Sequence, residues 1–188
     1  MNKLPQGFSQ SFFGINVRLV SEDDSEFIYR LRSDKVLTQH IHGFDGTIDE
    51  QREWLKKYKK REETGLEYYF IYSVGNTPFG VNRIYNIVDD EGTTGSWICV
   101  PGTNPIHVLA TSIILYDIAF DLIGFKRVLY DTRKDNSSAL KVNRAIGGKF
   151  LYETDLDYYF ELLPYDYHEV REVLLKRWHI NLLNNNHE

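Results

Sequence analysis

The sequence predicts an α+β fold, in which helices flank a mixed, mostly antiparallel sheet of about seven strands and an extra C-terminal helix follows. Two observations predict this fold class. Residues 68–100 form three strand-like runs joined by short turns, which is the pattern of an antiparallel meander. Residues 97–133 then run as strand, tight turn, apolar helix and strand, an order that implies a parallel pair with a right-handed crossover.

The first part of the chain predicts one strand and two helices. The expected elements are a strand over 13–20, a helix capped by Ser21, an irregular segment over 35–46 and a helix over 48–63. Thr47 and Glu50 stand at the spacing of a capping box, which fixes the start of the second helix. The irregular segment carries His40 and His42.

The remainder predicts the body of the sheet and its covering helices. The expected elements are strands over 68–74, 79–88, 93–100, 126–133, 150–154 and 158–163, with helices over 106–120 and 136–146. After Pro164, the spacing of Val170, Val173 and Leu174 predicts an amphipathic helix whose apolar face packs on the domain or on a second subunit. Residues 181–188 are expected to fray.

Composition narrows the class of protein. The 188 residues contain no linker or repeat, so we expect one domain over 1–188, with a core over about 13–163 and a helical extension over about 166–183. The net charge of −5 argues against a nucleic-acid partner. Cys99 is the only cysteine, which excludes an internal disulfide and is typical of the cytoplasm. We expect no leader peptide and no apolar segment long enough to span a membrane.

The break at residues 101–105 gives the first indication of a site. The first amides of the helix that follows, at Ile106, His107, Val108 and Leu109, have no partner within the helix. The helix dipole favours negative charge at this end, so a phosphate group could bind there. The alternative is a helix that only covers the sheet and binds nothing.

The element order from Phe13 to about Leu163 resembles the GNAT N-acetyltransferase fold. DTRKDNSSALKVNRAIGGKF, residues 131–150, is similar to the family's strand, asparagine, short helix and glycine. SWICVP, residues 96–101, looks like the strand whose backbone pairs with the pantetheine arm. The resemblance implies acetyl-CoA as acyl donor, held by Ile98, Cys99, Val100, Asn136 and Ser138. The most similar branch contains ribosomal-protein N-terminal acetyltransferases and amino-sugar N-acetyltransferases.

Two departures from the family pattern bear on catalysis. The loop that should bind the pyrophosphate reads PGTNPIH, in which Gly102 is the only glycine, so side chains limit the approach of a phosphate. Asn143 stands where many members have a tyrosine that protonates the departing thiolate. An amide donates a hydrogen bond but supplies no acid proton at neutral pH.

The implied mechanism needs an amide for the oxyanion and a neutral amine. Val100 or Cys99 is the expected amide donor. A lysine-like amine, with a pKa of ~10.4, costs about 4–5 kcal/mol to deprotonate at pH 7, and a sugar amine is less basic. His40 and His42 are candidate proton relays, with exposed loop histidines as the alternative.

Three further residues are candidates for binding the acceptor. Asp90 could anchor an amine, or it only builds a solvated turn. Tyr85 and Tyr158 could stack on a sugar ring, or they only pack the core. No spacing of metal-binding residues appears, so no metal is expected.

The sequence therefore predicts a cytoplasmic, acetyl-CoA-dependent N-acetyltransferase of a small amine, first of all a nucleotide-linked amino sugar, with a homodimer as one possible assembly. One alternative is N-terminal acetylation of a protein. The other is a non-catalytic binding protein that keeps the fold without its cofactor, which the glycine-poor loop would favour.

Overall fold

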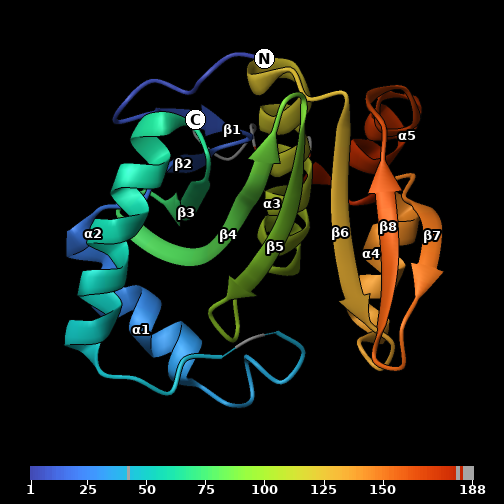
Figure 1. The fold of residues 1–188 in the computed structure, drawn as a ribbon. Coiled ribbons are helices and arrows are strands. Elements are labelled where there is room, and N and C mark those ends of the chain that lie inside the picture. The colour runs from blue at the N-terminus through green and yellow to red at the C-terminus, as the bar shows by residue number, and fades with distance from the viewer. Residues whose placement is uncertain (42, 181–182, 184–188) are drawn as a thin grey trace.

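A computed structural model describes residues 1–41, 43–180 and 183. Its centre is one eight-stranded sheet in the order β1-β2-β3-β4-β5-β6-β8-β7 (Figure 1). The strands are β1 (Ser9–Phe12), β2 (Ile15–Leu19), β3 (Tyr68–Val74), β4 (Thr77–Val88), β5 (Glu91–Cys99), β6 (Arg127–Arg133), β7 (Lys149–Glu153) and β8 (Asp157–Leu162). Only β5 and β6 pair in parallel among these strands, so the predicted mixed, mostly antiparallel sheet is confirmed.

The extra strand lies at the N-terminus. The single strand predicted over 13–20 is in fact the second arm of a hairpin, and the first arm is β1. The chain turns at Phe13 and Gly14, both of which have positive φ angles of 52° and 71°. Two consecutive residues with positive φ match the tight turn that suits the twist of a two-stranded ribbon.

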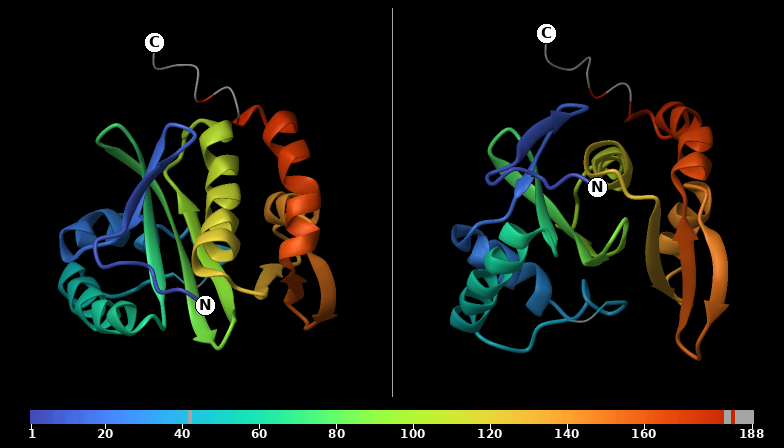
Figure 2. Two further views of the ribbon diagram at one scale, coloured as in Figure 1. Left: turned by 90° about the horizontal axis from the view of Figure 1, so that it is seen from above. Right: turned by 45° about the horizontal axis from the view of Figure 1, so that its top comes forward.

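Helices cover the sheet on both faces. They are α1 (Ser25–Ser33), α2 (Ile48–Thr64), α3 (Pro105–Asp117), α4 (Ser137–Ala145) and α5 (Pro164–Arg177), with a short turn η1 (Glu22–Asp24) before α1 and a π-helical segment η2 (Ile118–Ile123) after α3. Successive side chains of β3 point alternately into the two layers on either side of the sheet. Tyr68, Phe70 and Tyr72 pack in the cluster that contains α3, whereas Tyr69 and Ile71 pack against α1 and α2. Figure 2 shows these helices on the two sides of the sheet.

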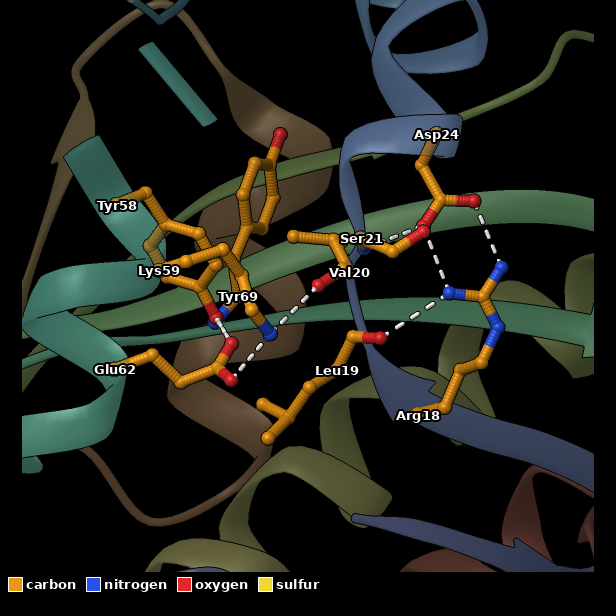
Figure 3. A network of polar contacts seen from close by, with 9 residues as sticks. All are labelled: Arg18, Leu19, Val20, Ser21, Asp24, Tyr58, Lys59, Glu62 and Tyr69. Carbon is orange, nitrogen blue, oxygen red and sulfur yellow. Dashed lines mark hydrogen bonds and ion pairs between the residues drawn. The ribbon is translucent and has the colours of Figure 1, made fainter. Parts of the chain in front are cut away.

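A polar network joins the start of α1 and the middle of α2 to the sheet (Figure 3). Asp24 accepts two hydrogen bonds of 2.7 Å from the Arg18 guanidinium and one of 2.7 Å from the Ser21 amide. The Arg18 ion pair and these hydrogen bonds lower the pKa of Asp24 in spite of its burial. From α2, the Tyr58 hydroxyl accepts the Tyr69 amide at 2.8 Å. The network thereby fixes the α1–α2 layer against β2 and β3.

The helix formed by α3 and η2 is the most apolar element. Contrary to expectation, Pro105–Ile123 is long and apolar enough to cross a membrane by length and composition alone. However, 67% of this span is buried inside the structure. The burial explains its apolar character, because a helix that is surrounded by the core of a protein has no polar face.

The C-terminal helix α5 packs on the domain, as predicted, and lies beside α3 (Figure 2); Val170 and Leu174 of the predicted face contribute to this packing. Tyr167 and Leu174 are buried, whereas Val173 is 57% exposed and does not belong to the packed face. The Tyr167 hydroxyl donates to Asp117 at 2.6 Å. Of the end predicted to fray, 181–182 and 184–188 lie outside the described residues, and Leu183 is buried.

Candidate active site

The two parallel strands separate and leave a cleft between them. They pair at only three positions, from Glu91 with Arg127 to Thr93 with Leu129. Beyond that point β5 and β6 diverge, and Figure 1 shows the gap widening toward the start of α3. Ser96 has a positive φ of 55° and lies in a β-bulge, where the register with β4 shifts. A bulge bends its strand and increases the local twist, which accounts for the divergence.

Side chains leave two connected chambers in this gap. The inner chamber, of about 120 Å³, lies between the diverging strands. The outer chamber, of about 500 Å³, lies between the end of β5, the start of α3 and α4. Trp97, Asn136 and Ala139 line both chambers, so the two form one channel from the helix start to the middle of the sheet.

The backbone at the end of β5 presents one amide to the channel. The Val100 amide, one of the two predicted oxyanion donors, already donates to the Phe79 carbonyl at 2.7 Å. Residues of an antiparallel pair alternate between hydrogen-bonded and non-bonded positions. Because Val100 is bonded to β4, the next position, Cys99 opposite Gly80, turns its amide away from β4 and toward the channel. Ile98 is bonded again, and its side chain is buried against α1 and α2.

The start of α3 offers fewer amides than the sequence suggested. Asn104 caps the helix, and its side chain accepts the Ile106 amide at 2.9 Å. The Asn104 carbonyl accepts the Val108 amide at 3.1 Å. Two amides of the expected anion site, those of Ile106 and Val108, are therefore already hydrogen-bonded within the chain. Leu109 lines the outer chamber. The binding of an anion by the His107 amide stays a prediction.

Burial holds two ionisable groups of this region in their neutral forms. The His107 ring lies 5.7 Å from the Phe79 ring, and desolvation lowers the pKa of His107 below its usual value. Desolvation raises the pKa of the Cys99 thiol to about 12. His107 thus brings no positive charge to the helix start at neutral pH, and Cys99 is not a thiolate nucleophile.

The wall formed by α4 carries the motif residues. Asn136 caps α4, accepting the Ala139 amide at 3.1 Å, and lines both chambers. Ser138 lines the outer chamber. Asn143 lines the inner one and donates to the Thr132 hydroxyl at 2.6 Å. This bond fixes the amide of Asn143 against β6, at the position for which the family resemblance implied a tyrosine.

The loop between α1 and α2 closes the inner chamber. His40 lines it, and its Nδ1 lies 3.2 Å from a carboxylate oxygen of Asp135 without forming a hydrogen bond. The imidazole is 24% exposed, so it is partly accessible from solvent. His42, the other candidate relay, lies outside the described residues.

The three predicted acceptor residues are not brought together. Asp90 lies in the β4–β5 turn, at the end where β5 and β6 pair, and forms an ion pair of 2.9 Å with Lys126. Tyr158 packs in the same layer as Phe160, on the α3 side of the sheet. Tyr85 lines a separate hollow on the opposite face.

Sequence reasoning missed Asp131, which lines both the inner chamber and the hollow beside Tyr85. The signal was present, because Asp131 follows Val128 and Tyr130 in an alternating strand and must therefore point away from the core. Among the residues that the structure describes, no group of three or more His, Cys, Asp or Glu side chains could hold a metal ion.

Comparison with known proteins gives a consistent result. A family model for the acetyltransferase (GNAT) domain matches residues 15–149. Apo FdhC, a nucleotide-linked sugar GNAT, is similar in structure with a TM-score of 0.80, 28% sequence identity and coverage of 94% of this chain and 99% of that chain. No curated protein sequence matches the chain.

Two more distant structures share the fold. Ribosomal-protein-S5-alanine acetyltransferase from Vibrio fischeri has a TM-score of 0.74 and 16% identity, over 85% of this chain and 98% of that one. RimJ from Mycobacterium smegmatis, in complex with CoA-disulfide, has a TM-score of 0.74 and 15% identity, over 87% and 88%. With the family model matching more than half of its residues, the chain belongs to the GNAT acetyltransferases, the family that uses acetyl-CoA to acylate amines.

Proposed function

We propose that the chain transfers an acetyl group from acetyl-CoA to the amine of a nucleotide-linked amino sugar. The observation that carries the proposal is its similarity to a nucleotide-linked sugar GNAT over nearly the full length of both chains. The similarities to the ribosomal-protein enzymes are at lower identity and indicate the common fold alone.

The channel fits an extended thioester. The donor's pantetheine arm would lie in the outer chamber beside Asn136 and Ser138. Its anionic end would lie at the start of α3, where His107 is the predicted amide donor. The thioester supplies an electrophilic carbonyl, and the Cys99 amide is oriented to donate to the oxygen on which negative charge develops. The leaving thiolate has an intrinsic pKa of roughly 8.5, so the hydrogen bond that Asn143 can offer is sufficient without an acid proton.

Asp131 is the residue that we assign to the acceptor amine. Asp131 lines both the inner chamber and the hollow on the open face. A carboxylate there attracts the ammonium form of the acceptor and orients the amine toward the thioester. A sugar amine, which is less basic than lysine, then needs little further help to lose its proton.

A second candidate function is a binding role without catalysis. The observation in its favour is the Asn104 cap, which occupies an amide that would otherwise face a phosphate. Thermal unfolding with and without acetyl-CoA separates the two candidates, because a ligand at about 100 times its dissociation constant adds ~2.7 kcal/mol of stability. The absence of any shift at millimolar acetyl-CoA would favour the binding role.

The acceptor is tested by following thiol release from acetyl-CoA with nucleotide-linked amino sugars, polyamines and basic peptides as acceptors. We expect release with the nucleotide-linked sugars. We also expect Asp131→Asn to lower kcat/KM at least about 10-fold, which corresponds to a loss of about 1.4 kcal/mol of transition-state stabilisation. Asp155→Asn, an exposed carboxylate in the β7–β8 turn, is the matched control. Activity on peptides alone would eliminate the sugar acceptor.

A further inference from the structure

One face of the sheet is left uncovered beside the channel. The helices α1 and α2 cover the part formed by β2 to β5, whereas α4 and α5 pack behind β6, β8 and β7. Figure 1 looks onto the opposite face of these last three strands, over which no helix of the described chain lies. A hollow of about 330 Å³ opens there, which is within the range of about 300–1,000 Å³ that is usual for ligand sites.

Aromatic rings line this hollow. Tyr85, Tyr152 and Tyr159 contribute to it, together with Leu129 and Leu151. The rings of Tyr152 and Tyr159 are stacked, with centroids 4.5 Å apart and planes inclined by 11°. Tyr152 remains 54% exposed although it is a large, partly apolar side chain. We define these five residues as the aromatic hollow.

A break in the strand register brings two consecutive residues to the aromatic hollow. Successive side chains of a regular strand point to opposite faces, yet Leu151 and Tyr152 both line this one hollow. The pairing of β7 with β8 shifts between Phe150 and Tyr152, which makes Leu151 the extra residue of a bulge. Bulges near functional sites commonly re-aim a side chain in this way. Phe150, in contrast, packs with Phe160 on the other face, at a centroid distance of 6.2 Å.

The aromatic hollow adjoins the inner chamber, but its far end at Tyr152 is too distant from Asp131 for a bare sugar to reach. Tyr130 and Asp131 border both the inner chamber and the hollow. From Asp131 on β6, Tyr152 lies two strands away, across β8 to β7, which is about 10 Å at ~4.8 Å per strand. A monosaccharide with its amine beside Asp131 does not reach Tyr152, whereas a nucleotide attached through a diphosphate does.

We propose that the aromatic hollow binds the planar base of the nucleotide carried by the acceptor, with Tyr152 stacking on it. The inference rests on the proposed function. Stacking suits the site because a tyrosine face accepts any planar base. Arg127 lies at the edge of the aromatic hollow, and its guanidinium forms an ion pair with Glu161 at 2.9 Å, so the site favours an uncharged ring rather than a second anionic group.

The test compares Tyr152→Ala with Tyr152→Phe and with Phe150→Ala. Phe150 is a matched control, because it lies on the same strand with a similar exposure of 56% but contacts Tyr158 and Phe160 on the opposite face. Steady-state kinetics with a nucleotide-linked amino sugar and calorimetric titration with TDP and UDP provide the two readouts. Tyr152→Ala should raise the acceptor KM and the dissociation constant of the better nucleotide about 10-fold. The KM for acetyl-CoA should not change.

Tyr152→Phe keeps the ring and should behave like the wild type, as should Phe150→Ala. Equal losses in Tyr152→Ala and Phe150→Ala, or a full loss in Tyr152→Phe, would overturn the stacking assignment. A change in molecular mass by light scattering would overturn it too, because Tyr152 would then belong to a contact between copies. If the wild type acetylates nucleotide-linked sugars and Tyr152→Ala has no effect, only this inference fails. If the wild type accepts no such sugar, the proposed function fails first.

Discussion

Replacing Arg171 by methionine should destabilise the fold strongly, because it leaves a carboxylate buried without its countercharge. Asp117, at the end of α3, has a side chain that is only 6% exposed. It accepts two hydrogen bonds of 2.7 Å from the Arg171 guanidinium and one of 2.6 Å from the Tyr167 hydroxyl. Removing one partner of such a buried pair costs about 3–5 kcal/mol, a large part of the stability of a small domain.

The assay is urea denaturation followed by circular dichroism at pH 7. Arg171→Lys keeps the charge but loses the two-pronged contact, so its loss should lie between wild type and Arg171→Met. Glu172→Gln is the control, since Glu172 is 69% exposed and its contact with Arg171 should contribute less than about 1 kcal/mol.

A double variant tests the cause of the loss. Adding Asp117→Asn to Arg171→Met removes the unpaired charge and should recover part of the stability, because replacing both partners costs less than orphaning one. A loss below about 1 kcal/mol in Arg171→Met, or a double variant no more stable than that single variant, would refute the reasoning.

Two further predictions concern the cofactor channel. A Cβ added at Gly80 would lie 2.8 Å from the Cys99 sulfur and 3.2 Å from the Ile98 carbonyl oxygen, so Gly80→Ala should cost about 1–3 kcal/mol and raise the KM for acetyl-CoA. Adding Cys99→Ala relieves only the first contact and should reverse part of both effects. If Gly80→Ala unfolds in urea with the same free energy as the wild type, the added methyl group does not meet the Cys99 sulfur and the prediction is wrong. His107 has a lower pKa in the folded state than in the unfolded state, where it is roughly 6.5. As the pH is lowered through this value, the unfolded chain binds the proton first, so the fold becomes less stable. His107→Gln should lose less stability than wild type between pH 7 and pH 5, and identical pH profiles would contradict the assignment.

Much of the fold follows from local signals that the structure confirms. Thr47 and Glu50 form the predicted capping box, with Glu50 accepting the Thr47 amide at 2.7 Å, and α2 begins at Ile48. The end of α2 at Gly65, in a left-handed conformation, follows the same kind of local rule. Such signals involve residues only a few positions apart, so a sequence window contains all of the interacting groups.

Two of the features that were missed depend on distant partners, and a third is a local contact that the sequence left ambiguous. The positive φ of Ser96 belongs to a non-glycine residue, and its bulge arises from the pairing of β5 with β4. The Asn104 side chain was available to cap α3, yet the loop sequence alone did not distinguish an amide capped by the protein from one left for a ligand. The choice between Val100 and Cys99 as the oxyanion donor depends on which of the two amides points toward β4. Only the register of β5 with β4, set by the hydrogen bond from Val100 to Phe79, decides this.

The divergence of β5 from β6 generates both the channel and the aromatic hollow. After Thr93, β5 follows β4 while β6 turns away with β8, so the amide of Cys99 meets no neighbouring strand. An unpaired backbone amide inside a protein is costly unless something accepts it, and a thioester oxygen in the channel is a suitable acceptor. The divergence also moves β6, β8 and β7 away from the cover of α1 and α2, which leaves the aromatic hollow open. Restoring a regular β5 would therefore close the channel. It would also remove the angle between the two parts of the sheet, and with it the surface on which a long acceptor could lie.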